Sequence, residues 1–155
     1  MNRRAFLLTT GAALAAHPLQ AATCGYEICR SEAEWRARLT ENEYLVMREE
    51  ETERPYTSPL NEESRSGTFH CRGCDLPLYS STAKYDSGTG WPSFFESLPN
   101  AVGTKEDRKF IFQVRTEVHC RRCGSHLGHI FDDGPEPTGK RHCLNGLSLA
   151  FVAAG

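Results

Sequence analysis

The strongest structural signal in the chain lies in the segment His119-Cys-Arg-Arg-Cys-Gly-Ser-His-Leu-Gly-His-Ile-Phe131. This segment contains one CxxC pair, Cys120 and Cys123, and a second pair, Cys71 and Cys74, lies far upstream. Two CxxC turns can direct four thiolates at one ion, which is a common arrangement for tetrahedral zinc. The sequence therefore predicts one folded body that brings the two pairs together around a zinc ion.

The predicted zinc site is structural, because a shell closed by four sulfurs leaves no position for water or substrate. The alternatives are four unrelated thiols or two disulfides, and a single CxxC pair also occurs as a redox pair. Two such pairs in one short chain favour the metal.

Composition limits the class of protein. The chain has 155 residues, which suits one domain, with or without an export segment. It has 18 Lys and Arg against 20 Asp and Glu, so charge gives no case for nucleic acid as a partner. Beyond the N-terminus no apolar stretch approaches the length of about 20 residues that spans a membrane. We expect a soluble mature chain with no stable membrane insertion.

Residues 1–22 resemble a bacterial signal peptide, and the pair Arg3 and Arg4 resembles a twin-arginine signal. An apolar run follows and stops at His17, and Gln20-Ala-Ala22 offers small residues for cleavage. This order favours export, to the bacterial periplasm, over a buried N-terminal helix. Cleavage would remove two of the 18 basic residues and none of the 20 acidic ones, which leaves a net charge of −4.

The mature chain divides into two predicted parts. Residues 23–30 form a flexible arm with Cys24 and Cys29, and residues 31–155 form one folded domain. Thiols in an exported protein are seldom idle, so the arm is a candidate for redox chemistry.

The folded domain is predicted to be mainly β (α+β), with short helices at its start. Ser31-Glu-Ala-Glu34 is a capping box, which predicts the start of a helix. Alternation over residues 110–118 predicts the clearest strand, and alternation over residues 147–151 predicts the last strand, which Cys143 enters. Short strands with long Gly- and Pro-containing connections favour antiparallel sheets.

Cys143 is the candidate nucleophile. Its basic neighbours at residues 140–142 are expected to lower the pKa of its thiol. On a strand, Arg141, Cys143 and Asn145 share one face, so a guanidinium, a thiol and an amide can line one pocket. The alternative is that Cys143 is a small buried hydrophobic residue.

His126 and His129 are candidates for proton transfer beside that thiol. The alternative is that both are ordinary core or loop residues. A second metal site using both histidines is also open, although no nearby acidic cluster completes it convincingly.

These residues belong to an ordered series of motifs that resembles the B-type methionine-R-sulfoxide reductases. The series covers about residues 31–152 and is specific because it is long and keeps its order. The matching segments are Thr52-Glu-Arg-Pro-Tyr-Thr-Ser-Pro59, Cys71-Arg-Gly-Cys74, Lys84-Tyr-Asp-Ser-Gly-Thr-Gly-Trp-Pro-Ser-Phe94, Arg115-Thr-Glu-Val-His-Cys-Arg-Arg-Cys123, His126-Leu-Gly-His-Ile-Phe131, Asp133-Gly-Pro135 and Arg141-His-Cys-Leu-Asn145.

The resemblance implies two antiparallel β-sheets in a barrel-like or tent-shaped domain, with structural zinc held away from the catalytic pocket. It implies thiol-dependent reduction of the R epimer of methionine sulfoxide in oxidised proteins. Cys143 would attack the sulfoxide sulfur and become a sulfenic acid, which a second thiol converts to a disulfide. A thioredoxin-like reductant would then reduce that disulfide.

The resemblance also assigns roles to the matching residues around Cys143. The polar ones are His129, His126, Asn145 and Arg141. His129, helped by His126, would protonate the leaving oxygen, and the other two would orient the thiolate. Trp91 would contact the substrate methyl group, with Phe94 and Phe131 supporting the apolar wall. Methyl and oxygen on separate walls would select one epimer.

The chain departs from a common family pattern at Thr89, where many members carry the resolving cysteine. Cys29 and Cys24 then become the candidates for the resolving thiol, with Cys29 preferred because it lies nearer the folded body. Two alternatives stay open. The two cysteines can form a disulfide with no role in turnover, or an external thiol can reduce Cys143 directly.

Two other classes of function remain. A zinc-knuckle module that binds protein or nucleic acid would leave Arg141, Cys143 and Asn145 without a purpose, and the negative charge argues against nucleic acid. A zinc hydrolase built on His126 and His129 would lose activity on chelation and would not need Cys143.

Overall fold

The computed structural model describes residues 24–110 and 113–155, so the predicted signal at residues 1–22 lies outside the described residues. In these described ranges, two short helices are followed by nine strands. The helices are α1 (Glu32–Arg38) and α2 (Glu41–Glu49), and the 3-10 turns are η1 (Pro59–Asn61), η2 (Ser81–Ala83) and η3 (Gly146–Ser148). The strands are β1 (Gly67–Cys71), β2 (Pro77–Ser80), β3 (Lys84–Tyr85), β4 (Ser93–Phe94), β5 (Val102–Phe110), β6 (Gln113–Cys120), β7 (His126–Phe131), β8 (Arg141–Leu144) and β9 (Leu149–Ala153).

The helices start where the sequence supplies capping boxes. The hydroxyl of Ser31 accepts a hydrogen bond from the backbone N–H of Glu34. The Glu34 carboxylate in turn accepts one from the backbone N–H of Ser31, which is the predicted capping box. Thr40 and Glu43 repeat the arrangement at the start of α2. Trp35 is buried on α1, and α2 packs against β7 and η3.

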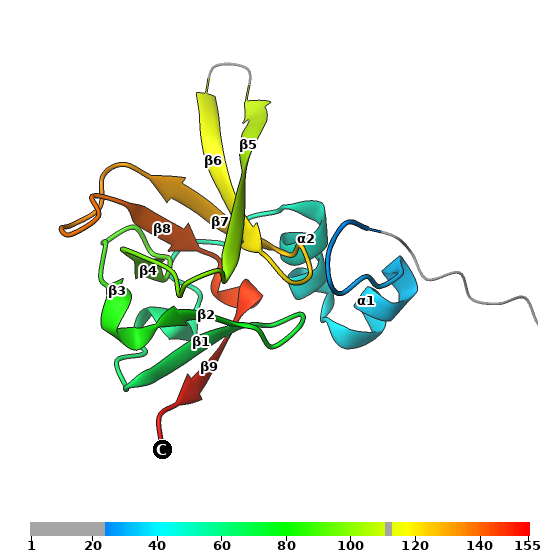
Figure 1. Ribbon diagram of the computed structural model, residues 1–155, viewed down its shortest axis with the longest axis horizontal. Helices are drawn as coiled ribbons and strands as arrows, with labels where there is room; N and C mark the ends of the chain where they lie inside the picture. Colours follow the sequence, from blue (N-terminus) through cyan, green and yellow to red (C-terminus); the bar gives the residue numbers. More distant parts are fainter. Residues whose placement is uncertain (1–23, 111–112) are drawn as a thin grey trace, which may run out of the picture.

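The strands form two antiparallel sheets (Figure 1), which confirms the predicted fold class. The order is β2-β1-β9 in the small sheet and β3-β4-β8-β7-β6-β5 in the large one. Both are open, so the described residues do not close into a barrel. In Figure 1 the β5–β6 hairpin projects from the body, and both helices lie to one side of the sheets.

Two strand predictions are wrong. Residues 110–118 do not form one strand, because β5 ends at Phe110, which pairs with Gln113 at the start of β6; residues 111–112 lie outside the described residues. Both arms of a hairpin keep a period of two, so alternation cannot mark where the chain turns. Cys143 also does not enter the last strand. It lies in β8, and η3 separates β8 from β9.

The apolar core lies where the two sheets face each other. Phe69 of the small sheet and Phe94 of the large one are both fully buried, with ring centroids 5.0 Å apart. Tyr79 packs on Phe94 at 4.7 Å. Phe94 thus fixes β4 to the core beneath β8. Within the described ranges, the structure contains no helix of the length and apolarity needed to cross a membrane.

Candidate active site

A cavity of about 130 Å³ opens beside strands β7 and β8. It is lined by Thr52, Trp91, Arg115, Gly128, His129, Phe131, Cys143, Leu144 and Asn145. The structure therefore brings together five of the residues predicted for the site, which are Cys143, His129, Asn145, Trp91 and Phe131. The other three, His126, Arg141 and Phe94, lie outside the lining.

Strand pairing places the Cys143 thiol. Cys143 on β8 pairs with Ser93 of β4 on one side and with His129 of β7 on the other. Residues directly opposite in antiparallel strands point to the same face, so the thiol and the imidazole share one side of the sheet. The hydroxyl of Thr89 lies 3.9 Å from the sulfur. The half-buried thiol thus faces both a ring and a hydroxyl.

The pKa of Cys143 is raised, which is opposite to the direction expected from its basic neighbours. Burial raises the pKa, and only Thr89 and Arg141 oppose it. Lys140 is paired with Asp132 instead. His142 points to the other face of β8, where it bonds Tyr79, and burial lowers its pKa to about 4, so it is neutral. Successive residues of a strand face opposite ways, and this explains the failed expectation.

Arg141 is held by two contacts beside the cavity. Its guanidinium donates to both carboxylate oxygens of Asp133, at 2.8 and 2.9 Å. It also lies over the ring of Phe131, 4.4 Å from the centroid. A bidentate pair and a stacked ring fix the position of the cation near Cys143.

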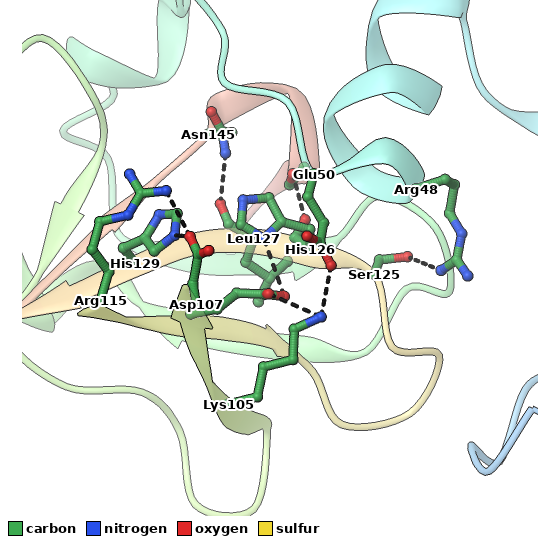
Figure 2. Close-up of polar contacts among 12 residues, drawn as sticks. Arg48, Glu50, Lys105, Asp107, Arg115, Ser125, His126, Leu127, His129 and Asn145 are labelled. Atoms are coloured by element: carbon green, nitrogen blue, oxygen red, sulfur yellow. Dashed lines mark hydrogen bonds and ion pairs between the residues drawn. The ribbon is translucent and has the colours of Figure 1, made fainter. Parts of the chain in front are cut away.

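His129 is bonded by a carboxylate that the sequence analysis did not identify. Its Nε2 lies 2.8 Å from Oδ2 of Asp107, and the guanidinium of Arg115 donates to the same oxygen at 2.6 Å (Figure 2). Burial lowers the pKa of His129, and the bond to Asp107 opposes that shift. The ring is therefore mostly neutral at neutral pH but has a partner that favours its protonated form.

His126 sits deeper, next to a second carboxylate. It is 2% exposed, and its Nδ1 lies 3.2 Å from Oε1 of Glu117. Lys105 pairs with Glu117 at 3.0 Å and with Glu50 at 2.6 Å. The rings of His126 and His129 meet edge to face, 5.4 Å apart. His126 thus lies outside the cavity lining and contacts it at His129.

Glu53 ties together the residues at the cavity's back wall. Its N–H donates to the side-chain oxygen of Asn145, whose amide nitrogen donates to the carbonyl of Leu127, each at 3.1 Å. Its carbonyl accepts from the indole N–H of Trp91 at 3.0 Å. Its buried carboxylate accepts from the backbone N–H groups of Gly146 and Leu147. The positions of Asn145 and Trp91 therefore depend on one loop residue.

The four cysteines of the two CxxC pairs form the predicted cluster. Their sulfurs lie within 4.8 Å of one another, with 3.7 Å between Cys71 and Cys123 and 3.5 Å between Cys74 and Cys120. A tetrahedral shell with Zn–S bonds of about 2.3 Å places its sulfurs ~3.8 Å apart, so the cluster fits a metal ion of this kind. Only Cys74 is partly exposed.

Elsewhere in the described ranges, no other group of three or more His, Cys, Asp or Glu side chains comes together in this way. The zinc hydrolase built on His126 and His129 therefore has no support in the geometry.

Residues 39–153 match the family model of the SelR domain. The chain belongs to the SelR domain family. A peptide methionine sulfoxide reductase MsrB from Agrobacterium fabrum is 45% identical, over 81% of this chain and 93% of the relative. The MsrB of Thiobacillus denitrificans is 49% identical, over 79% of this chain and 92% of the relative. The predicted family is thereby confirmed.

Two chloroplastic relatives are longer. The chain is 50% identical to the peptide methionine sulfoxide reductase B1 of Arabidopsis thaliana and 48% identical to that of rice. It spans 61% and 58% of their lengths, respectively. These two relatives therefore contain further segments with no counterpart in the aligned part of this SelR chain.

The arm in front of the SelR domain is folded against it. Cys24 and Cys29 are joined by a disulfide, which is one of the alternatives left open by the sequence. The N–H of Ile28 donates to the carbonyl of Arg122, and Tyr26 packs edge-on against His119. The arm thus lies on the second CxxC turn, and Figure 1 places it beside α1, on the side away from β8.

Several residues of the SelR site were given no role by the sequence analysis. Thr52 and Arg115 line the cavity, and each opens a motif of the family resemblance, which was a usable signal. Glu53 follows Thr52 in the same motif. Asp107 lies in no matching motif, so only the pairing of β5 with β6 reveals it.

Proposed function

We propose that this chain is a peptide-methionine (R)-S-oxide reductase that repairs oxidised methionine in proteins. One observation carries the proposal: the Cys143 thiol, the His129 ring and the Trp91 ring line one small cavity. The names of the relatives, peptide methionine sulfoxide reductases, support the same reaction.

The cavity suits the end of one side chain. Its volume of about 130 Å³ admits a methylsulfinyl group while the rest of a protein substrate stays outside. Trp91 and Phe131 offer an apolar surface for the methyl group, and His129 offers a nitrogen for the oxygen. The two epimers differ in which substituent meets which wall, so the cavity can select one.

The reaction moves one oxygen from substrate to enzyme. The Cys143 thiolate attacks the sulfoxide sulfur, and a proton from His129 makes the oxygen a better leaving group. The substrate sulfur gains two electrons and becomes the thioether of methionine. The Cys143 sulfur loses two electrons and becomes a sulfenic acid that carries the oxygen. Arg141 supports the thiolate, and Asn145 holds the chain beyond β8.

A thioredoxin-like reductant is proposed to restore Cys143, through Cys29 or Cys24 as the resolving thiol. Attack of that thiol on the sulfenic acid forms a disulfide and releases water. Because Cys24 and Cys29 are joined to each other, their disulfide must first be reduced. Direct reduction of Cys143 by an external thiol is the competing route. Ser variants of Cys24 and Cys29, single and double, slow multiple turnover only if the resolving route operates.

The metal of the four-cysteine cluster is proposed to be zinc. Cys71, Cys74, Cys120 and Cys123 would hold it, and when bound it cross-links the two CxxC turns and supplies no reactive position. Metal analysis of the purified chain tests this; one zinc per chain is expected, and iron in its place would contradict it.

Export through residues 1–22 is also proposed, because Arg3 and Arg4 precede an apolar run and small residues. Expression in a bacterium should give a periplasmic protein whose mass lacks that segment. Replacing both arginines by lysine should keep the protein in the cytoplasm if the twin-arginine route is used. An unprocessed cytoplasmic wild type would contradict the proposal.

A single-turnover experiment tests the nucleophile. The chain, with its arm disulfide intact and no reductant, is mixed with an R-sulfoxide peptide and a sulfenic-acid trap. We expect about one methionine per chain and the trap attached to Cys143. No methionine should form with Cys143→Ser, and methionine without modification of Cys143 would refute the assignment.

A further inference from the structure

Two buried carboxylates lie on the face of the sheet that carries the histidines. Asp107 is 8% exposed and Glu117 is 2% exposed. Strand pairing sets Asp107 opposite Arg115, and Lys105 opposite Glu117. Each carboxylate thus has a cation directly across the strand, which offsets the cost of burying its charge.

The two carboxylates differ in what else they reach. The β6–β7 pairing sets Glu117 opposite His129 and, after a register shift, His119 opposite His126. The Glu117 carboxylate nevertheless lies 3.2 Å from the ring of His126. The carboxylate that contacts His129 is that of Asp107, with 2.8 Å between Nε2 of His129 and Oδ2 of Asp107. Figure 2 shows the contacts from the His129 ring and from the Arg115 guanidinium converging on the Asp107 carboxylate. The residue that contacts the cavity's histidine is therefore on β5, two strands away.

We propose that Asp107 is a positioning residue for His129, accepting the Nε2–H so that Nδ1 is the nitrogen left for the substrate oxygen. The proposal rests on the proposed reductase function. A carboxylate bonded to one ring nitrogen fixes both the orientation and the tautomer of an imidazole. Arg115 holds the carboxylate in place, since its guanidinium donates to the same oxygen.

The charges around His129 give the bond a second consequence. The groups that face it are Asp107 on β5, Arg115 and Glu117 on β6, His126 on β7 and Cys143 on β8. Burial, Arg115 and His126 all lower the pKa of His129, and Asp107 opposes them. Loss of the Asp107 charge should therefore lower the pKa of His129 further and leave less imidazolium to protonate the sulfoxide.

The test compares Asp107→Asn with Glu106→Gln, which makes the same charge change on an exposed neighbour that pairs with Arg108. Nitrogen-15 NMR of the histidine rings gives the tautomer and the pKa of His129, whose signals are assigned by their loss in His129→Gln. We expect the wild-type neutral ring to carry its proton on Nε2. We expect Asp107→Asn to lower the pKa of His129, and Glu106→Gln to leave it unchanged.

Kinetics give the matching readout. Asp107→Asn should lower kcat/KM for the R-sulfoxide peptide on the order of tenfold or more, since imidazolium is the acid. It should also move the acid limb of the pH profile to lower pH. Glu106→Gln should match the wild type in both. An unchanged His129 pKa together with an unchanged profile in Asp107→Asn would overturn the proposal.

Two safeguards separate the possible failures. If Asp107→Asn does not fold, the wild-type spectrum still decides, because a neutral His129 protonated on Nδ1 would overturn the proposal. If the folded wild type reduces no sulfoxide, the proposed function fails, while the NMR comparison still shows whether Asp107 holds the ring. Asp107 and the reductase function are therefore judged by different measurements.

Discussion

At the scale of single residues, the site holds a thiol and an imidazole that are each uncharged near neutral pH. Burial raises the pKa of Cys143 and lowers the pKa of His129. The reactive pair, a thiolate with an imidazolium, is then a minor form of the free enzyme. A substrate that binds between Cys143 and His129 meets both groups in one partly buried cavity.

These directions predict the pH dependence of kcat/KM. Below the pKa of His129 this ring is almost fully protonated, and the thiolate fraction of Cys143 falls as the pH falls. Above the pKa of Cys143 this thiol is almost fully deprotonated, and the imidazolium fraction of His129 falls as the pH rises. We therefore expect a bell-shaped profile of kcat/KM against pH. Its acid limb should lie below pH 6.5, because the pKa of His129 is lowered from that ordinary value. Its alkaline limb should lie above pH 9.0, because the pKa of Cys143 is raised from that ordinary value.

The measurement is kcat/KM for an R-sulfoxide peptide from pH 5 to about 10, with stability checked at each end. The His129→Gln variant is the control, and its alkaline limb should disappear. An alkaline limb centred near pH 7 in the wild type would contradict the burial of Cys143.

The predicted period of a strand grouped Arg141, Cys143 and Asn145, and the structure brings two of them, Cys143 and Asn145, to one cavity. Asn145 lies just beyond β8, and Arg141 lies outside the cavity lining. The direction expected for the thiol's pKa was wrong because Lys140 and His142 point away or are paired elsewhere. The sequence could not reveal Asp107, whose relation to His129 depends on the register of three strands.

At the scale of elements, the loop that contains Glu53 joins separate parts of the site. The Glu53 carboxylate accepts from the first two N–H groups of η3, and its backbone groups hold Asn145 and Trp91. Glu53 is only 8% exposed, so these bonds are shielded from water. The loop's position thus sets the distance between the aromatic wall and β8.

Replacing Glu53 by Gln should destabilise the fold. The amide keeps one acceptor but places N–H donors against the N–H groups of η3. We expect a loss of about 1–3 kcal/mol in the free energy of unfolding, the range for a hydrogen bond to a charged group. Urea unfolding measures it, with exposed Glu51→Gln expected within about 0.5 kcal/mol of the wild type. Equal stability of the two variants would contradict the role given to Glu53.

Elements were predictable where a local signal marks them. The capping box at Ser31 fixed the start of α1. The β5–β6 hairpin and the break between β8 and β9 were missed, because alternation continues across both. Strand β8 lies between β4 and β7 in the large sheet. This position is set by contacts between residues that are distant in sequence, so no local sequence pattern indicates it.

At the scale of the whole molecule, the four-cysteine cluster joins segments that are far apart in sequence. Cys71 ends β1 of the small sheet, and Cys120 ends β6 of the large one. A metal held there links the two sheets at their ends, and the disulfide-closed arm lies over the second CxxC turn. The cluster was predictable because CxxC spacing is itself a local signal.

Removal of the metal should therefore act on the stability of the fold and not directly on the chemistry at Cys143. Metal bound only by the folded state contributes directly to stability, so chelation should lower the melting temperature by on the order of 10 °C or more. Cys120→Ser should behave like the chelated wild type, whereas Cys143→Ser should keep its metal. An unchanged melting temperature after complete metal loss would contradict a structural role.

The most direct measurement is the reduction of peptides that carry either epimer of methionine sulfoxide, with dithiothreitol as reductant, by the wild type and by Cys143→Ser. We predict turnover of the R epimer alone, and none with the variant. Failure of a folded, metal-loaded wild type to reduce the R epimer would contradict the proposed function. Equal turnover of both epimers, or R turnover without Cys143, would contradict the site as assigned.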